Sequence, residues 1–347
     1  MGPVTPTRHT RMLAADQAGI AAAAEILRAG GLVAFPTETV YGLGAAALDR
    51  VAVAGIFEAK GRPANDPLIV HVVDFSRSGE IAMTTAVARR LAEAFMPGPL
   101  TLVLRRLPIV PDVVTAGLDT VAIRVPAHPV ARALLGAARL PIAAPSANLF
   151  GRPSPTRASH VLEDLGGRID AIVDGGATPV GLESTIVDVS EDVPRLLRPG
   201  GLSAETIEAV LGMALLPPPI EPAPLAPGML PAHYAPRTDL VLVTGPPARA
   251  RGRLATELRE ALADGQRVGV LLLDEDRDLI PPGVTQQEVG SYAAPDAVAA
   301  RLFDALRALD RVGLDMLFTR QLANPSSGIG RALADRLRRA AQRTIDA

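Results

Sequence analysis

The chain has 347 residues, a length that suggests about two domains. Hydrophobic residues make up 48% and charged residues 21%, a composition that excludes a disordered chain. The net charge of −2 argues against a protein that coats nucleic acid, and the absence of cysteine excludes disulfides, thiolate metal sites and cysteine nucleophiles.

Hydrophobic periodicity and turn residues predict an α/β domain in the first part of the chain. The first helix, over 16–29, has Asp16 as a cap and Gly30-Gly31 as a stop. Further helices are predicted over 51–59, 87–95 and 129–135, and strands over 32–35, 68–73, 100–104, 121–125, 142–144, 171–173, 185–189 and 195–197. Strands and helices are interleaved throughout 12–212, which predicts a sheet of mixed rather than purely parallel strands.

The composition changes over 213–237. Residues 216–231 contain seven prolines and almost no charge, which predicts a semi-rigid linker that ends in the polar run 233–237. Strands over 240–244, 267–273 and 314–319 then alternate with helices over 249–263, 294–309 and 329–341. This pattern predicts a small doubly wound α/β domain over 238–347. Residues 326–330 imitate a dehydrogenase nucleotide loop, but so few residues follow that we expect no βαβ unit there.

Lys60 is the only lysine among the 35 basic residues of the chain. It lies two residues before Arg62, in the segment Lys60-Gly61-Arg62-Pro63 that follows a predicted helix. A compact ammonium and a planar guanidinium in a rigid turn suit a polyphosphate. The same two cations would also stabilise a helix C-terminus, but that interpretation does not account for the proline-rich exit. We therefore favour phosphate binding and expect Lys60 to be an exposed charge in a pocket. Replacement of Lys60 would then leave the fold intact.

Other polar residues follow predicted strands, where ligands of α/β folds bind. Thr37 and Thr39 lie in a loop after the strand 32–35, and Gly42 and Gly44 would let the backbone approach a ligand there. Arg124 lies in an apolar strand and needs a carboxylate, either from a ligand or from the chain itself.

A second group of candidates surrounds the strands that end near residues 144 and 197. Ser146, Asn148 and Ser154 could hold phosphate oxygens, and Arg198 repeats the rigid basic turn of Lys60. His71, alone in a strand, is more typical of a core residue.

Several motifs occur together in one order: PTETVYGLG, KGRP, NDPLIVHV, PGPLT, TAGLDTVAIRVP, APSAN and ESTIVD. This series resembles the YrdC-like family of L-threonylcarbamoyladenylate synthases, and the later LRPG and HYAP resemble its long two-domain form. The resemblance covers nearly the whole chain. It implies a twisted mixed sheet with helices over 12–212, a linker or lid over 213–237, and a Rossmann-like domain over 238–347.

The resemblance also implies a reaction. L-threonine, bicarbonate and ATP, which carries Mg²⁺, would become threonylcarbamoyl-AMP and pyrophosphate. A tRNA threonylcarbamoyl transferase would then use the product to modify an adenosine, with weak or indirect binding of tRNA by this chain. No apolar run is long enough to span a bilayer, and residues 1–11 lack a signal-peptide core, so we expect a cytoplasmic protein without membrane contact. We expect no tightly bound metal.

The resemblance assigns three sets of site residues. The catalytic set is Lys60, Arg62, Ser146 and Asn148. The L-threonine site is Thr37, His71, Arg124, Ala144 and Ser184. The ATP site is Lys60, Arg62, Asn65, Thr120, Ser146, Asn148, Ser154, Arg198 and Tyr234, with Tyr234 arriving from the linker to exclude water.

The sequence disfavours two other interpretations. A double-stranded RNA-binding module is disfavoured by the net charge and by the few aromatic residues. A carbamoyltransferase maturation factor, which also forms a carbamoyl adenylate, would need zinc-finger cysteines that this chain lacks.

Overall fold

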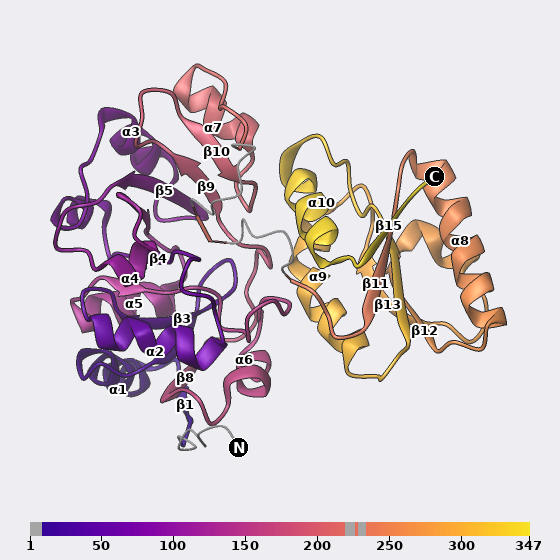
Figure 1. The fold of residues 1–347 in the computed structure, drawn as a ribbon, viewed down its shortest axis with the longest axis horizontal. Coiled ribbons are helices and arrows are strands. Elements are labelled where there is room, and N and C mark those ends of the chain that lie inside the picture. The colour runs from indigo at the N-terminus through magenta and orange to yellow at the C-terminus, as the bar shows by residue number, and fades with distance from the viewer. Residues whose placement is uncertain (1–8, 219–225, 228–233) are drawn as a thin grey trace.

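Two sheets organise the chain, which confirms the predicted α/β class with a second, smaller unit (Figure 1). The structure is a computed structural model that describes residues 9–218, 226–227 and 234–347. A ten-stranded sheet occupies the indigo-to-pink half of Figure 1, and a five-stranded sheet occupies the orange-to-yellow half. Within these residues, no helix has the length and apolar character needed to cross a membrane.

The ten-stranded sheet is mixed, as predicted. Its spatial order is β1 (Arg11–Ala14), β8 (Ala171–Asp174), β2 (Val33–Pro36), β3 (Tyr41–Ala46), β7 (Ile142–Ala143), β4 (Ile69–His71), β6 (Thr120–Arg124), β5 (Leu100–Arg105), β9 (Thr185–Asp188) and β10 (Arg195–Arg198). β4 pairs with β6 in parallel, whereas β2 with β3 and β5 with β6 are antiparallel. The helices of this part are α1 (Gln17–Arg28), α2 (Arg50–Lys60), α3 (Ala86–Phe95), α4 (Asp112–Thr115), α5 (Pro129–Ala138), α6 (Ala158–Leu165) and α7 (Ala204–Leu211), with a 3-10 turn η1 (Phe75–Glu80).

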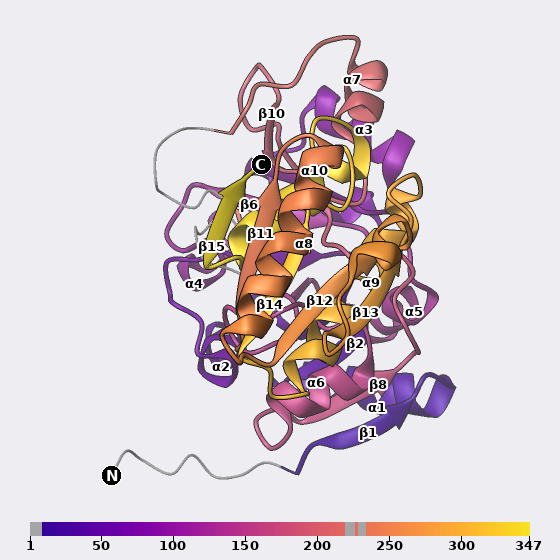
Figure 2. The ribbon, with the colours of Figure 1, turned by 90° about the vertical axis from the view of Figure 1, so that its right-hand side faces the viewer.

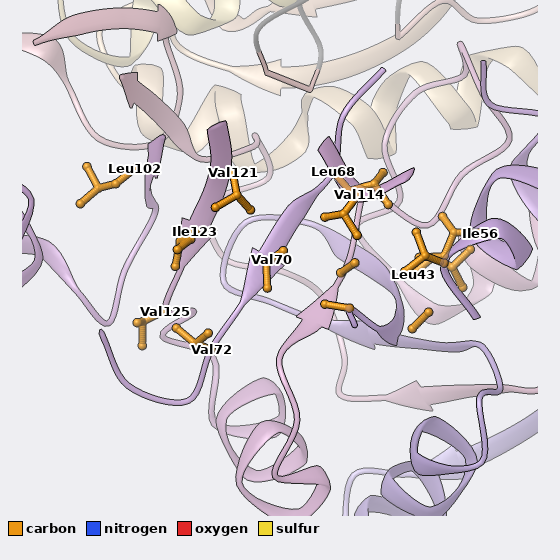
Figure 3. Close-up of a cluster of buried hydrophobic side chains, with 14 of the residues drawn as sticks. Leu43, Ile56, Leu68, Val70, Val72, Leu102, Val114, Val121, Ile123 and Val125 are labelled. Atoms are coloured by element: carbon orange, nitrogen blue, oxygen red, sulfur yellow. The ribbon is translucent and has the colours of Figure 1, made fainter. Parts of the chain in front are cut away.

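The largest core lies between this sheet and its helices. Val70 of β4 and Ile123 of β6 contribute side chains that are almost fully buried, and Ile56 of α2 belongs to the same cluster (Figure 3). Each fully buried aliphatic side chain of this kind stabilises the fold by about 1.5–3 kcal/mol. This core fixes β4 and β6 side by side, so that His71 and Arg124 are register partners at their ends.

The five-stranded sheet is entirely parallel. Its order is β13 (Thr285–Gly290), β12 (Val268–Leu273), β14 (Met316–Arg320), β11 (Asp239–Thr244) and β15 (Arg343–Asp346). Helix α8 (Pro247–Ala263) covers one face, and α9 (Pro295–Asp310) and α10 (Gly328–Ala340) cover the face turned toward the first sheet (Figures 1 and 2). A 3-10 turn, η2 (Asp274–Leu279), follows β12. Helices on both faces of a parallel sheet confirm the doubly wound prediction.

Two local predictions were wrong. The segment after β2, predicted to be a loop, forms the strand β3, which places Gly42 and Gly44 in the sheet. A Cβ on Gly44 would lie 2.8 Å from the ring of Phe35, so glycine lets two strands pack closely there. β15 follows α10 after two residues, so β14, α10 and β15 do form a βαβ unit. The unit is so short that the sequence did not predict it.

Buried ion pairs join the two parts of the molecule. Arg307 of α9 lies 2.5 Å from Asp164 of α6, and each side chain is only 1% exposed. Arg152 pairs with Asp310 at 2.8 Å, and the other carboxylate oxygen of Asp310 accepts hydrogen bonds from the backbone of Arg237 and Thr238. The end of the linker is thus held by α9. The limits 12–212, 213–237 and 238–347 stay predictions, since residues 219–225 and 228–233 lie outside the described residues.

Candidate active site

Polar segments that are far apart in the sequence converge on one cavity. The predicted residues that line it are Thr37, Arg62, His71, Arg124, Ala144, Ser146, Ser184, Arg198 and Tyr234. The structure therefore brings the whole predicted threonine set and part of the predicted ATP set to one place. The rest of the lining is Thr39, Val40, Gly42, Ile69, Pro145, Glu183 and Pro227.

The Lys60 and Arg62 pair is positioned by the way α2 begins and ends. Asp49 caps its first turn, and Gly61 ends it with φ 63°, a left-handed conformation that favours glycine. Arg62 then turns toward the cavity, where it pairs with Asp66 at 2.8 Å and donates to the carbonyl of Pro67 at 2.8 Å. The predicted rigid turn is present, with Arg62 held by its own loop.

The expectation that Lys60 is an exposed pocket charge was wrong. Lys60 is 2% exposed, and its Nζ donates to the carbonyl oxygens of Ser146 and Asn148 at 2.6 and 2.5 Å. Burial, followed by repulsion from Arg62, holds the pKa of Lys60 well below its usual range. The lysine thus fastens the Ser146–Asn148 loop to α2 from behind the cavity. Only a side chain with a compact head and a long stem fits between two such carbonyls.

Arg124 and His71 form the floor of the site. Nη2 of Arg124 lies 2.6 Å from Oε1 of Glu38, and Nε donates to the carbonyl of Gly98 at 3.3 Å. Nδ1 of His71 is buried and has no hydrogen-bond partner among the described residues. Burial, followed by the charge of Arg124, lowers the pKa of His71 to about 3, so the imidazole is neutral. A ligand in the cavity meets a neutral ring beside a guanidinium.

Ser184 and Arg198 form another part of the lining. The hydroxyl of Ser184 lies 2.7 Å from that of Thr101, and Arg198 donates to the Ser184 carbonyl at 2.9 Å. Within the described residues, neither Arg198 nor Lys60 has a carboxylate within 4.0 Å. Arg198 therefore lines the cavity as a buried cation without a direct counter-ion, an arrangement that favours an anionic ligand.

Besides Lys60, four predicted ATP residues do not line the cavity. Asn148 and Ser154 are fully buried just behind the lining, where Ser146 donates to Asn148 at 2.6 Å. Asn65 is exposed in the loop after Gly61, and Thr120 is half-buried at the start of β6. The structure thus does not bring Asn65 and Thr120 to the cavity, and their role stays a prediction.

Described parts of the linker close the cavity. Ala226 is fully buried in a cluster with Ile69 and Leu197, and the carbonyl of Pro227 accepts a hydrogen bond from Arg198 at 2.9 Å. Tyr234 is 1% exposed and stacks on Phe303 of α9, with 5.6 Å between ring centroids. Two separate points of the linker thus lie against the site.

Reasoning from the sequence missed three charged residues. Glu38 and Glu183 lie inside motifs that had been interpreted through their hydroxyl neighbours, although a carboxylate next to a buried arginine is a readable signal. Arg336 lies on α10, at the far end of the sequence, and is fully buried against Glu183 at 2.7 Å. Nothing distinguished it from the other arginines of that helix. Among the described residues, no three carboxylate or histidine side chains are grouped to hold a metal ion.

The fold and the cavity define a two-domain α/β protein whose larger sheet carries a cavity lined by three arginines and several hydroxyl groups. Residues 25–200 match the Sua5/YciO/YrdC family, described as "Telomere recombination", and residues 202–342 match the family described as "Threonylcarbamoyl-AMP synthase, C-terminal domain". The chain belongs to the threonylcarbamoyl-AMP synthase family, in its long two-domain form.

Individual relatives agree with this assignment. The chain is 46% identical to the threonylcarbamoyl-AMP synthase of Pyrococcus abyssi over 92% of each chain, and 45% identical to that of Bacillus subtilis over 96% of this chain and 95% of the relative. Among solved structures, P. abyssi Sua5 complexed with L-threonine has a TM-score of 0.91 at 42% identity, covering 97% of this chain and all of that one. The family predicted from the motifs is confirmed.

Proposed function

We propose that this chain is an L-threonylcarbamoyladenylate synthase, which makes threonylcarbamoyl-AMP and pyrophosphate from L-threonine, bicarbonate and ATP. The observation that carries the proposal is Arg198, a buried guanidinium that lines the cavity and has no carboxylate partner among the described residues. The cost of burying such a charge is offset when an anion binds next to it. ATP supplies that anion, and the relatives' names supply the reaction.

The threonine end of the site is proposed at Arg124. Its guanidinium lines the cavity and has already been turned toward it by the bond to Glu38. A guanidinium binds a carboxylate with two parallel hydrogen bonds, which would orient the amino acid. Thr37, His71 and Ser184 lie around the same space and would read its polar groups. Because the imidazole of His71 is neutral, it would not repel a positively charged threonine amine.

The proposed chemistry has two steps. Bicarbonate takes up a proton and loses water to give carbon dioxide, and the threonine amine then adds to the carbon dioxide, which gives a carbamate and releases a proton. A carbamate oxygen then attacks the α-phosphorus of ATP, the bond from that phosphorus to the bridging oxygen breaks, and pyrophosphate leaves. Arg62 and Arg198, which line the cavity, would stabilise the charge that grows on the phosphate oxygens, and Lys60 would hold the Ser146–Asn148 loop in place behind them. The protein's contribution is to position the reactants and to supply positive charge, since no covalent nucleophile is needed.

Further parts of the proposal concern the surroundings of the reaction. Mg²⁺ would enter with ATP as part of the substrate and leave with pyrophosphate. Tyr234 would keep water from threonylcarbamoyl-AMP, because it lines the cavity and its ring is stacked on Phe303. The product would pass to a tRNA threonylcarbamoyl transferase in the cytoplasm, and contact of this chain with tRNA would be weak or indirect.

Isotope labelling tests the proposal. Purified protein is incubated with L-threonine, ATP, Mg²⁺ and ¹³C-bicarbonate, and the product is analysed by mass spectrometry. We expect one species that contains threonine, AMP and a single labelled carbon. AMP without an attached threonine carbamate, or an adduct that lacks the label, would contradict the proposed reaction.

A further inference from the structure

Arg336 is the deepest link between the two parts of the molecule. It lies on α10, a helix that packs on the five-stranded sheet. Its side chain is fully buried and points toward residues of the first unit. Its Nε lies 2.7 Å from Glu183, and its Nη2 donates at 3.0 Å to the carbonyl of Pro199, next to Arg198. Asp335 also accepts a bond from Nη1 at 2.5 Å. One side chain from the second unit thus reaches groups that line the cavity of the first.

The contact with Glu183 controls the charge beside the cavity. Glu183 lines the cavity, and its other carboxylate oxygen accepts a hydrogen bond of 2.5 Å from Ser154. Burial raises the pKa of Glu183, but Arg336 and then Arg198 outweigh burial and keep it below its usual range, so the carboxylate is ionised. A buried carboxylate without Arg336 would repel a triphosphate placed in the same cavity. It would also attract Arg198 away from the ligand.

The same guanidinium holds the linker residue that covers the cavity. Its central carbon lies 5.1 Å from the centroid of the Tyr234 ring, within the range of a cation–π contact. Tyr234 adopts a left-handed backbone with φ 67°, a conformation that is uncommon for a residue with a side chain. Phe303 and Arg336 both contact the ring of the residue that adopts this conformation. Helices α9 and α10 thus both contribute to holding Tyr234 against the cavity.

We propose that Arg336 is a positioning residue for adenylation, through which the second α/β unit takes part in the reaction. It neutralises Glu183 so that a triphosphate can bind next to it, and it fixes Tyr234 over the bound reactants. This inference rests on the proposed function, because it assigns the contribution of α10 to the ATP side of that site. It predicts that loss of the guanidinium acts on ATP and leaves the threonine end, around Arg124, little changed.

The test compares Arg336→Met with Arg331→Met. Both arginines are on α10 and both reach the first unit, but Arg331 forms a half-exposed pair with Glu205 at 3.0 Å, away from the cavity. Pyrophosphate release is measured against ATP and against L-threonine. We expect Arg336→Met to raise the KM for ATP at least about tenfold and the KM for threonine less than about twofold, and Arg331→Met to change neither. Equal changes in both KM values, or a normal KM for ATP, would overturn the inference.

Two further measurements keep the test decisive. Calorimetric titration with Mg·ATP alone measures nucleotide binding whether or not the chain uses threonine, so failure of the proposed function is distinguishable from failure of this inference. In Arg336→Met, a second change, Glu183→Gln, removes the unpaired charge, and we expect it to recover part of the ATP affinity. Absence of any recovery would overturn the charge-neutralising role. If Arg336→Met does not fold, Arg336→Gln, which removes the charge but keeps a polar side chain, is titrated in its place. We expect it to bind ATP more weakly than the unchanged protein, and equal affinity would overturn the inference.

Discussion

Arg124 and Glu38 form an ion pair whose atoms are 2.6 Å apart, while the same guanidinium lines the cavity. Reasoning from the sequence left open whether the partner of Arg124 is a carboxylate of the chain or of a ligand. The structure shows the carboxylate of the chain, bound through Nη2, and no hydrogen bond from Nη1 to another described residue. The pair therefore orients Arg124 and leaves one edge for a second carboxylate.

Disrupting this pair should cost stability in a coupled way. Glu38→Gln leaves the buried charge of Arg124 uncompensated, and we expect the free energy of unfolding to fall by about 3–5 kcal/mol. The double variant Glu38→Gln/Arg124→Met should lose less than the sum of the two single changes, because the second change removes a group that has already lost its partner. Urea unfolding of the four proteins measures this coupling. Additive losses would mean that the pair does not contribute as a unit.

Lys60 should matter for both fold and chemistry. Lys60→Ala leaves two carbonyl oxygens without their donor, so we expect about 2 kcal/mol of lost stability in addition to loss of adenylate formation. Lys60→Arg restores a charge but not the compact head, and we expect it to stay at least about a hundredfold below the unchanged protein. Thermal unfolding and pyrophosphate release test the two effects separately. Full activity in Lys60→Arg would refute the argument from lysine shape.

His71 makes stability depend on pH. Its pKa falls from 6.5 to about 3 on folding, mainly through burial and then through Arg124, so the unfolded chain binds more protons between these values. The free energy of unfolding should therefore fall as the pH decreases from 6.5, with a slope that approaches about 1.4 kcal/mol per pH unit. His71→Gln should remove this contribution. The measurement is urea unfolding of both proteins between about pH 5 and 7. If their free energies of unfolding changed with pH in parallel, the lowered pKa of His71 would not be the cause.

Tyr234 should protect the adenylate from water. Tyr234→Ala removes the ring that contacts Phe303 and Arg336, and we expect more ATP to be hydrolysed for each molecule of threonylcarbamoyl-AMP that is made. Tyr234→Phe keeps the ring and serves as the matched control. The ratio of pyrophosphate to product, followed by chromatography, measures the effect. An unchanged ratio in Tyr234→Ala would reduce the linker to a spacer.

The sequence predicted the main elements because strands such as β4 and β5 are short apolar runs bounded by turn residues. It failed at β3, where two glycines imitate a loop although tight packing on Phe35 requires one of them in the sheet. It failed again at β15, whose side chains are largely exposed and show no apolar pattern. Hydrophobic periodicity in a sequence reflects which side chains are buried. An exposed edge strand such as β15 therefore shows little periodicity.

The site could be assembled from motifs because the residues of one loop stay together in the fold. Contacts between distant segments carry no such signal. Glu183 could be read as part of a motif, but its partner Arg336 comes 153 residues later. The burial of Lys60 was also hidden, because backbone carbonyl oxygens satisfy it and every residue type supplies these.

The most direct test of the proposed function is pyrophosphate release from ATP by the purified full chain, with L-threonine and bicarbonate omitted in turn. The account predicts rapid release only when both are present, because the attacking carbamate is made from the two together. Release that continues at the same rate without threonine would contradict the account. It would also remove the roles proposed for Thr37 and Arg124.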